Sequence, residues 1–443
     1  MTDRLSAREF LTLVTDDSTF TELPYPARLA KPDGPLAWQG YDASRARAAE
    51  RTGESESVVC GTATVTGTPA VLIAFEFGFL GGSLGERTGD RLEAAYTYAR
   101  EHRLPVVPLV ATGGSRMQEG MLALTQLQRV AHQSALTREA GLPQIAVLRD
   151  PTTGGGWATL GAGADVILAL PDAQVGFAGS RVRPPDADPT AYTAQAQLAA
   201  GAVDAVVQPE ELRETLGRWL GLLTSPAQEV PLHASPGATR EHLPATGWAA
   251  VHRARSPERP RAHAYLDAYF TDRVRISGDR CGGTDPGMLC GFGARDGRTV
   301  AYAAQTGTAT RPAGYRTAAR LIRLAGRLGV PVLTLVDTPG AANDAEAERQ
   351  GAGAAIADVF AAVAAARTPV TTLVIGEGGS GGALALAAPG NTWATPDSYF
   401  SVIAPESAAA ILKRPPTQVE ATADQLRLRP QDLLELGVIR GIV

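Results

Sequence analysis

The chain repeats itself once, with an offset of 226 residues. The matching segments are PVVPLVATGG at 105–114 with PVLTLVDTPG at 331–340, PQIAVL at 143–148 with PVTTLV at 369–374, and Gly155-Gly156 with Gly381-Gly382. A further pair, GTPAVLIA at 67–74 with GRTVAYAA at 297–304, matches with a drift of four residues. Self-similarity at a fixed spacing indicates duplicated structural units. We therefore predict two homologous halves within the 443 residues.

Proline separates the halves. Residues 224–262 carry six prolines and little periodic apolar pattern, which is typical of a linker. The predicted organisation is an N-terminal half at 1–223, a Pro-rich linker at 224–262 and a C-terminal half at 263–443.

Each half shows the same order of short apolar strands and amphipathic helices. The predicted strands are 105–111 and 144–149 in the first half, and 331–337 and 370–375 in the second. The predicted helices are 88–102, 119–139, 314–328 and 345–366. Strands that alternate with helical patterns indicate an α/β fold with buried, largely parallel strands. Both an open doubly wound sheet and a superhelix of ββα turns fit this pattern.

Composition excludes several classes of protein. The net charge is −5, and no run of Lys or Arg suggests nucleic acid or a membrane surface as a partner. Three cysteines without a CxxC pair make neither a disulfide framework nor a zinc site, so we expect no metal. The opening MTDRLSAREF has no apolar core of a signal peptide, and no apolar run is long enough to span a bilayer. We expect a cytoplasmic protein.

Glycines recur where predicted strands meet helices, at equivalent places in both halves. These are Gly113-Gly114 and Gly155-Gly156 in the first half, and Gly340 and Gly381-Gly382 in the second. Glycine lets a ligand approach backbone N–H groups, and two converging N–H groups form an oxyanion hole that stabilises an enolate. The alternative is that these glycines only permit tight turns and close packing. Their recurrence in both halves favours the oxyanion holes.

Three common motifs do not explain these glycines. GEGGSG at 376–381 spells GxGxxG, but the equivalent segment of the first half, DPTTGG, does not keep this nucleotide-binding pattern. Ser380 lies in a GxSxG sequence, yet every histidine precedes it, whereas a serine hydrolase of that type needs a later one. The ATP-binding pattern GxxxxGK[ST] is absent from the sequence.

The charged residues near the glycines could have either functional or structural roles. Glu119, Glu377 and Glu406 could act as acids or bases, although structural hydrogen bonding is commoner for such residues. Arg116 and Arg316 could bind phosphate, although solvated or bridging arginines are commoner.

These residues carry a family resemblance. FEFGFLGGS at 75–83, ATGGSRMQEG at 111–120, DPTTGG at 150–155 and GFAG at 176–179 resemble the β subunit of the bacterial acetyl-CoA carboxylase carboxyltransferase. DTPGA at 337–341, IGEGGSGGAL at 375–384 and YFSVIAPE at 399–406 resemble its α subunit. The chain thus resembles a β–α fusion, which implies two tandem crotonase-like ββα-superhelix domains.

The resemblance implies a biotin-dependent acyl-CoA carboxyltransferase. Biotin would be carried by a separate biotin carboxyl carrier protein and loaded by biotin carboxylase, and the chain would form a homodimer or a dimer-based oligomer. The first half would hold the acyl thioester at Gly113, Gly114, Gly155 and Gly156, with Gly81, Gly82, Ser83, Arg116 and Trp157 around the acyl-CoA. The second half would hold biotin at Gly340, Ala341, Gly381, Gly382 and Ala383.

The sequence also departs from that family. The four-cysteine zinc ribbon is missing, the basic stretch before Gly314-Tyr-Arg316 is cut to residues 306–313, and Trp157 stands where smaller residues are usual. A tryptophan beside an oxyanion hole would reshape the acyl pocket, so acetyl-CoA is only the default substrate. Two alternatives stay open: a decarboxylase of malonyl or methylmalonyl thioesters, and a non-catalytic scaffold of a carboxylase complex.

Overall fold

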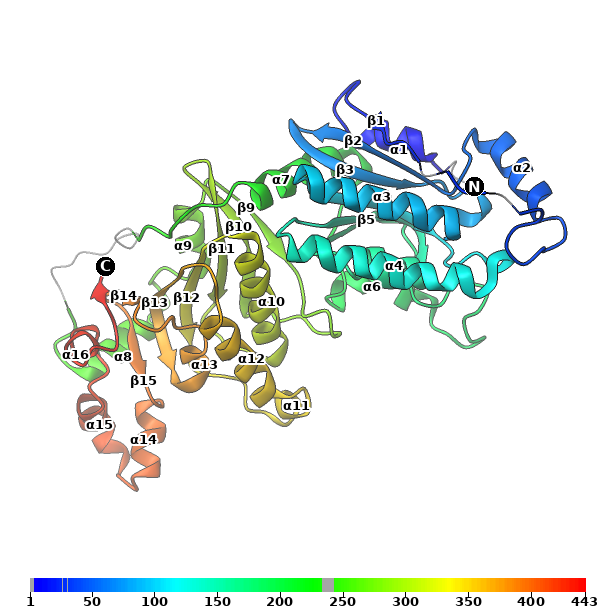
Figure 1. The fold of residues 1–443 in the computed structure, drawn as a ribbon. Helices are drawn as coiled ribbons and strands as arrows, with labels where there is room; N and C mark the ends of the chain where they lie inside the picture. The colour runs from blue at the N-terminus through cyan, green and yellow to red at the C-terminus, as the bar shows by residue number, and fades with distance from the viewer. Residues whose placement is uncertain (1–3, 26, 30, 233–242) are drawn as a thin grey trace. The chain divides into compact units, whose positions relative to one another are not determined.

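The computed structural model describes residues 4–25, 27–29, 31–232 and 243–443. These residues form two compact units, Met1–Thr224 and Ser225–Val443, which we call unit 1 and unit 2. Each unit contains one mixed sheet with helices packed against it (Figure 1).

The strands of the two units correspond one to one. Those of unit 1 are β1 (Thr21–Glu22), β2 (Val58–Val65), β3 (Thr68–Phe75), β4 (Val106–Thr112), β5 (Ile145–Thr153), β6 (Val166–Ala169), β7 (Val175–Gly176) and β8 (Ala205–Val206). Those of unit 2 are β9 (Asp272–Ile276), β10 (Met288–Arg295), β11 (Arg298–Gln305), β12 (Val332–Thr338), β13 (Val370–Gly379), β14 (Thr392–Ala394), β15 (Tyr399–Ser401) and β16 (Gly441–Ile442). The sheet orders are β1-β2-β3-β4-β5-β6-β8 and β9-β10-β11-β12-β13-β14-β16.

Each sheet starts with a hairpin and continues in parallel strands. β2 and β3 pair antiparallel, as do β10 and β11. Their turns, Thr66-Gly67 and Asp296-Gly297, have positive φ at both residues, which matches the right-handed twist of a tight hairpin. The strands that follow pair in parallel through β3-β4-β5-β6 and β11-β12-β13-β14.

One strand in each unit changes partners along its length. β5 pairs with β6 through residues 145–148 and then with β7 through Thr152 and Thr153. β13 likewise pairs with β14 through residues 372–374 and with β15 through residues 377–379. The end of each of these strands therefore keeps its pairing with β4 or β12 but takes a new neighbour on the other side, just before a predicted glycine cluster.

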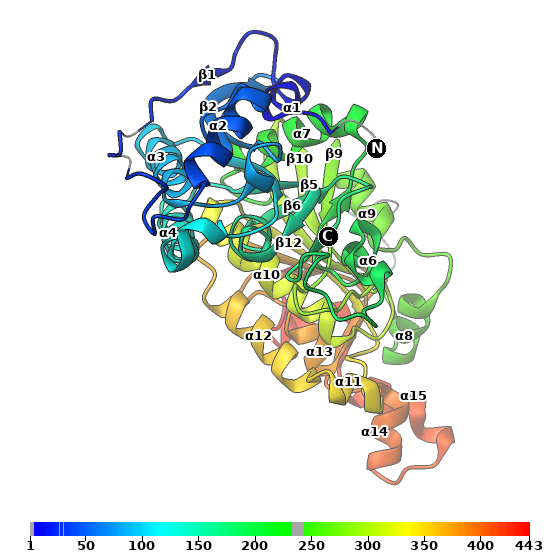
Figure 2. The same cartoon turned by 90° about the vertical axis from the view of Figure 1, so that its right-hand side faces the viewer.

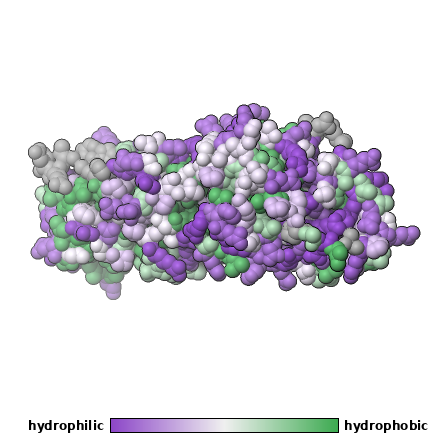
Figure 3. Space-filling model, turned by 45° about the horizontal axis from the view of Figure 1, so that its top comes forward, coloured by the Kyte–Doolittle hydropathy of each residue, from purple (hydrophilic) through white to green (hydrophobic). Residues whose placement is uncertain are grey.

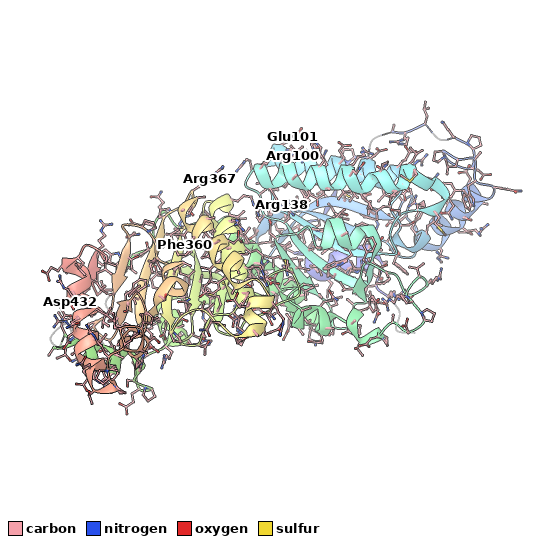
Figure 4. All side chains as sticks on the ribbon, turned by 90° about the horizontal axis from the view of Figure 1, so that it is seen from below. Arg100, Glu101, Arg138, Phe360, Arg367 and Asp432 are labelled. Carbon is pink, nitrogen blue, oxygen red and sulfur yellow. The ribbon has the colours of Figure 1, made fainter. Side chains whose placement is uncertain are left out.

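The helices of unit 1 include two long neighbours. They are α1 (Ala7–Val14), α2 (Tyr41–Thr52), α3 (Glu86–His102), α4 (Gly120–Glu139), α5 (Gly154–Gly156), α6 (Ala194–Ala199) and α7 (Leu212–Thr224). Figure 4 labels Arg100 on α3 and Arg138 on α4. The two helices are joined by Arg100, which donates to Oε1 of Gln133 at 2.6 Å. Buried aliphatic residues of β3, β4, β5 and β6 form the core beneath them.

The helices of unit 2 begin inside the Pro-rich segment. They are α8 (Gly247–Arg255), α9 (Ala262–Tyr269), α10 (Pro312–Leu328), α11 (Ala345–Arg349), α12 (Ala352–Ala364), α13 (Ser380–Leu384), α14 (Pro405–Ile411), α15 (Val419–Gln425) and α16 (Pro430–Glu435). Ala250, Val251 and Ala254 of α8 are buried with Tyr399 and Leu428. Part of the segment that we expected to be a linker thus packs into unit 2. Within that unit, α14 and α15 lie together at one end (Figure 2).

The four-residue change in the spacing of the sequence repeat arises in one loop of the structure. Both hairpins have the same length, but the loop from Phe75 to Leu84 is four residues longer than the loop from Gln305 to Thr310. The additional residues therefore lie in the loop that carries Gly81, Gly82 and Ser83.

Candidate active site

Three loops of unit 1 meet at the carboxyl ends of β3, β4 and β5. The amide of Gly113 donates to the carbonyl oxygen of Gly81 at 2.9 Å, and the amide of Leu84 donates to that of Gly114 at 2.9 Å. Gly114 also lies against the start of α5, because a Cβ on it would be 3.7 Å from Cα of Gly154. The fold thus brings together the three glycine segments that the sequence predicts for the acyl-CoA side.

Glycine is required at Gly82. Its φ is +63°, and an added Cβ would lie 2.1 Å from the carbonyl oxygen of Ala111. No larger residue fits between these two loops without moving the backbone of β4.

Unit 2 repeats the same backbone hydrogen bonds. The amide of Thr310 donates to Gly340 at 3.2 Å, as Leu84 donates to Gly114. The amide of Ala342 donates to Thr310 at 2.9 Å, as the amide of Arg116 donates to Leu84 at 2.9 Å. The loops after β11, β12 and β13 therefore meet as those of unit 1 do, and they bring Gly340 and Ala341 beside Gly382.

Two threonines that we did not predict hold the middle loop of each unit. Thr112 Oγ1 accepts from the amide of Gly114 at 3.0 Å, and Thr338 Oγ1 accepts from the amide of Gly340 at 3.2 Å. The sequence could have indicated them, because Thr112 and Thr338 occupy equivalent positions of the repeat.

The hydrogen bonds divide the predicted glycines into two groups. The amides of Gly113, Gly114 and Gly340 are taken up by Gly81, Thr112 and Thr338, so these glycines fix the loops. The remaining amides of the clusters, which we expect to face a ligand, are those of Gly155, Gly156, Gly381 and Gly382. At Gly381 no atom lies within 4 Å of the place of an added Cβ, so open space adjoins its backbone.

The start of α13 contains a serine in a glycine conformation. Ser380 has φ +58° and is exposed, whereas the equivalent residue of unit 1, Gly154, has φ +63°. A left-handed conformation costs a non-glycine residue roughly 1–2 kcal/mol. The sequence therefore carries strain at this position in unit 2 only.

Arg116 lies inside unit 1 and not at its surface. Only 1% of its side chain is exposed; Nη1 donates to Oε2 of Glu56 at 3.1 Å, and Nη2 donates to the carbonyl oxygen of Ser83 at 2.7 Å. Nε donates to Oγ of Ser83 at 3.2 Å. The predicted direct contact of Arg116 with acyl-CoA does not fit this placement. The arginine instead holds the Ser83 loop.

The ion pair keeps both buried groups charged. Burial by itself lowers the pKa of Arg116 and raises that of Glu56. Their mutual attraction outweighs burial, so the pKa of Arg116 lies above its usual value and that of Glu56 below. Glu56 is the partner of Arg116 that the sequence analysis missed, because it lies 60 residues away in the chain.

Trp157 is half buried beside the glycines of α5. An added Cβ on Gly161 would be 2.5 Å from Cε3 of its indole ring, so the ring lies over Gly161. Residues Trp157–Gly161 form a π-helical turn directly after α5. The indole packs against the core of unit 1.

The other charged candidates have partners within the protein. Glu119 accepts from Tyr41 Oη at 2.5 Å and from the amide of Glu86 at 2.6 Å. Glu377 and Glu406 both bind Arg255, at 2.8 and 2.5 Å. Arg316 binds Asp279 at 2.7 Å. These contacts favour structural roles for all four.

Among the described residues, no group of three or more His, Cys, Asp or Glu side chains is placed to hold a metal ion. No helix in the described part of the chain has the length and apolar character that crossing a membrane requires. The face in Figure 3 mixes hydrophilic and hydrophobic residues.

Two family models match the chain. The acetyl co-enzyme A carboxylase carboxyltransferase-like model matches residues 239–443, and the carboxyl transferase domain model matches residues 37–206. The acetyl-coenzyme A carboxylase carboxyl transferase subunits beta/alpha of Saccharopolyspora erythraea is 38% identical over 91% of this chain and 74% of the relative. The protein of the same name from Salinispora arenicola is 39% identical over 99% of this chain and 82% of the relative.

Solved structures show the same fold. Transcarboxylase 12S, solved as a hexamer with methylmalonyl-coenzyme A and methylmalonic acid bound, matches with a TM-score of 0.81 at 20% identity, over 99% of this chain and 87% of that chain. A single-chain, multi-domain long-chain acyl-CoA carboxylase matches with a TM-score of 0.76 at 20% identity, over 99% of this chain and 44% of that one. The predicted pair of crotonase-like α/β domains is confirmed, and the doubly wound sheet is excluded.

Proposed function

The chain belongs to the acetyl-CoA carboxylase carboxyltransferase family and is a biotin-dependent acyl-CoA carboxyltransferase; on that premise we propose how its two units divide the reaction. Unit 1 holds the acyl-CoA, and unit 2 holds the biotin that carries the carboxyl group. The reaction moves this carboxyl group to the α-carbon of acetyl-CoA or a related thioester. The repeated meeting of three loops at glycine clusters carries this proposal.

In unit 1, the amides of Gly155 and Gly156 stabilise the thioester oxygen when the α-carbon loses its proton and the enolate forms. Backbone donors fixed before the reaction stabilise this developing charge without reorganising. Gly113 and Gly114 keep the neighbouring loop in place through Gly81 and Thr112. Gly81, Gly82 and Ser83 line the CoA side, and Arg116 fixes Ser83.

The glycine segments of unit 2 suit the flat ureido ring of biotin. The open space at Gly381 admits a ligand to the backbone, and Gly382 is packed so closely that a Cβ would lie 2.5 Å from the amide nitrogen of Ala341. We propose that Gly381 and Gly382 bind the ureido oxygen, while Gly340, Ala341 and Ala383 form the wall around it.

Carboxybiotin, when bound, supplies the CO₂ and then a basic ureido nitrogen. The chain therefore has to bind, orient and exclude water, and it needs no base of its own. Glu119, Glu377 and Glu406 are each paired with other side chains of the protein, which agrees with the absence of a protein base from the reaction.

The partners follow from the same proposal. A separate biotin carboxyl carrier protein would deliver biotin after loading by biotin carboxylase, in the cytoplasm. We expect a homodimer or a dimer-based oligomer; the transcarboxylase 12S structure, which has this fold, is described as a hexamer.

The direct test measures loss of the carboxyl group from malonyl-CoA with and without biocytin, a soluble biotin amide. Biocytin-dependent loss supports the proposal. Loss without biocytin would instead indicate a decarboxylase, and binding without any turnover would indicate a scaffold. Methylmalonyl-CoA in parallel reports the preferred acyl group.

A further inference from the structure

A cluster of buried polar side chains anchors the glycine segment of unit 2. Gln305 Nε2 donates to the carbonyl oxygen of Gly382 at 3.2 Å, and Tyr315 Oη donates to the same oxygen at 3.0 Å. Gln305 Nε2 also donates to Oγ1 of Thr310 at 3.1 Å. We call Gln305, Thr310 and Tyr315 the carbonyl anchor. All three side chains are buried.

The anchor joins the two loops of the predicted biotin site. Thr310 binds the Gly340–Ala342 loop through its backbone, donating to Gly340 at 3.2 Å and accepting from Ala342 at 2.9 Å. The tyrosine hydroxyl would lie 2.5 Å from an added Cβ on Gly382, so the contact is tight. Burial raises the pKa of Tyr315, which keeps its hydroxyl protonated as a donor.

Unit 1 shows that the fold does not require this anchor. The residues at the equivalent places are Phe75 for Gln305, Leu84 for Thr310 and Gly89 for Tyr315. The backbone bonds among the loops nevertheless form in the same pattern, and the atoms nearest to an added Cβ on Gly156 belong to the side chains of Thr112 and Leu84. The polar anchor is therefore specific to unit 2.

Keeping the anchor carries a cost. Gln305 is fully buried, and its Oε1 atom has no hydrogen-bond partner among the described residues. An unpaired buried polar atom is destabilising, and such atoms in native proteins call for an explanation. An apolar residue like the one in unit 1 would avoid this cost, so a requirement of the site explains why glutamine is present.

We propose that Gln305 and Tyr315 are positioning residues of the biotin side, which act by fixing Gly382 relative to the Gly340–Ala341 loop. This inference rests on the proposed function and deepens it. Neither side chain touches the ligand itself. They set the separation of the two backbone segments between which the ureido group binds, and the acyl-CoA side in unit 1 does not depend on them.

The test compares Tyr315→Phe and Gln305→Leu with Tyr302→Phe. Tyr302 is a matched control, because it is also buried in unit 2 and its hydroxyl donates to the carbonyl oxygen of Val274 at 3.1 Å, within the hairpin region. Each protein is assayed for biocytin-dependent kcat/KM, malonyl-CoA Kd, urea midpoint, and hydrogen–deuterium exchange of residues 376–388.

We expect Tyr315→Phe and Gln305→Leu to lower biocytin kcat/KM about tenfold or more, a loss typical of misplaced reacting groups. Exchange in residues 376–388 should accelerate, while malonyl-CoA Kd stays within about twofold of wild type. Tyr302→Phe should shift the urea midpoint similarly to Tyr315→Phe but leave kcat/KM and exchange unchanged.

The inference is overturned if both Tyr315→Phe and Gln305→Leu match Tyr302→Phe in kcat/KM and in exchange. It is also overturned if malonyl-CoA affinity falls as much as biocytin kcat/KM. Absence of biocytin turnover in the wild-type protein would refute the proposed function instead, and the exchange data would then still decide whether the anchor orders Gly382.

Discussion

Arg259 and Asp337 form an almost completely buried ion pair, in which Nη2 of the arginine donates to Oδ1 of the aspartate at 2.5 Å. Asp337 begins the DTPG segment that leads to Gly340, and its Oδ1 also accepts from the amide of Glu377 at 3.1 Å. Arg259 comes from the segment that the sequence presents as a linker. We therefore propose that residues 247–262 belong to the structure of unit 2 and help to hold the segment that leads to Gly340.

Replacing Arg259 by methionine should destabilise unit 2 strongly. The change leaves the buried Asp337 with the longer contact to Arg261, at 3.2 Å, and the hydrogen bond from the amide of Glu377, but without its buried ion-pair partner. Breaking a buried pair costs about 3–5 kcal/mol. The measurement is the free energy of unfolding in urea.

Arg261→Met is the control, because the Arg261 side chain is 36% exposed and solvent screens its contact with Asp337, so its loss should cost less than the loss of Arg259. Equal losses for the two variants would contradict the assignment of the buried pair.

Gly381→Ala should keep the fold and lose activity. Open space lies where its Cβ would be, so the methyl group would not clash with the protein but would occupy the proposed ligand space. We expect an unchanged urea midpoint and a fall in biocytin kcat/KM of about tenfold or more, as reacting groups lose their alignment.

Gly353→Ala, in α12, is a matched control because it also faces open space. It should retain activity and gain up to about 1 kcal/mol in stability from better helix propensity. Full activity of Gly381→Ala would argue against a ligand at that glycine.

Glu406→Gln should weaken the protein at neutral pH and not in acid. The hydrogen bond from Arg255 lowers the pKa of Glu406. A carboxylate with a lowered folded pKa stabilises the fold above its unfolded pKa of about 4.3, and loses this contribution as pH falls through the folded value.

The difference in unfolding free energy between wild type and Glu406→Gln should therefore be largest near about pH 7 and close to zero below about pH 3. Arg255→Met should produce the same pH pattern. If the difference in unfolding free energy does not change with pH, the ion pair between Arg255 and Glu406 is not the source of the stability loss.

One of the three thiols should react with Ellman's reagent in the native protein. Cys281 is exposed, whereas Cys60 and Cys290 are buried and burial raises the pKa of each to about 12. Because the thiolate is the reactive form, the two buried thiols, Cys60 and Cys290, should stay unreacted until urea unfolds the chain. Rapid reaction of all three at neutral pH would contradict the burial of these strands.

Trp157→Ala should relax the choice of acyl group at some cost in stability. The indole covers Gly161 beside the acyl glycines, so its removal opens space there. Loss of a fully buried tryptophan costs about 3–5 kcal/mol, and this half-buried ring should cost less. The measurement is the ratio of kcat/KM for propionyl-CoA to that for acetyl-CoA, which should rise; Trp393→Ala in unit 2 should not change it.

The sequence predicts the framework of each unit because its signals are local. Most bounds of the buried strands and amphipathic helices lie within two residues of those expected, as with α10 at Pro312–Leu328 for an expected 314–328. β5 and β13 each end four residues later than expected. The expected helix at 345–366 is instead two helices, because Gly351 takes φ +78° between α11 and α12. A single glycine inside an apolar helical pattern does not by itself predict that one helix ends there and another begins.

The side-chain partners could not be predicted in the same way. Arg116 is conspicuous in the sequence, but its partner Glu56 comes from a distant loop and only the fold brings them together. The roles of Gly113, Gly114 and Gly340 depend on which acceptor their amides meet. The acceptor for Gly113 is the carbonyl oxygen of Gly81, and the acceptor for Gly114 and for Gly340 is a threonine whose position in the repeat was visible but whose orientation was not.

The shared loop contacts of Leu84 and Gly114 in one unit, and of Thr310 and Gly340 in the other, are made by main-chain atoms alone. A duplicated gene could therefore exchange side chains around these loops in each copy without dismantling either. The two copies were free to specialise, one for each reactant. The same side chains can therefore be exchanged by design, with one restriction. Gly89, the position equivalent to Tyr315, packs against Gln126, so a tyrosine at position 89 needs a smaller residue at position 126.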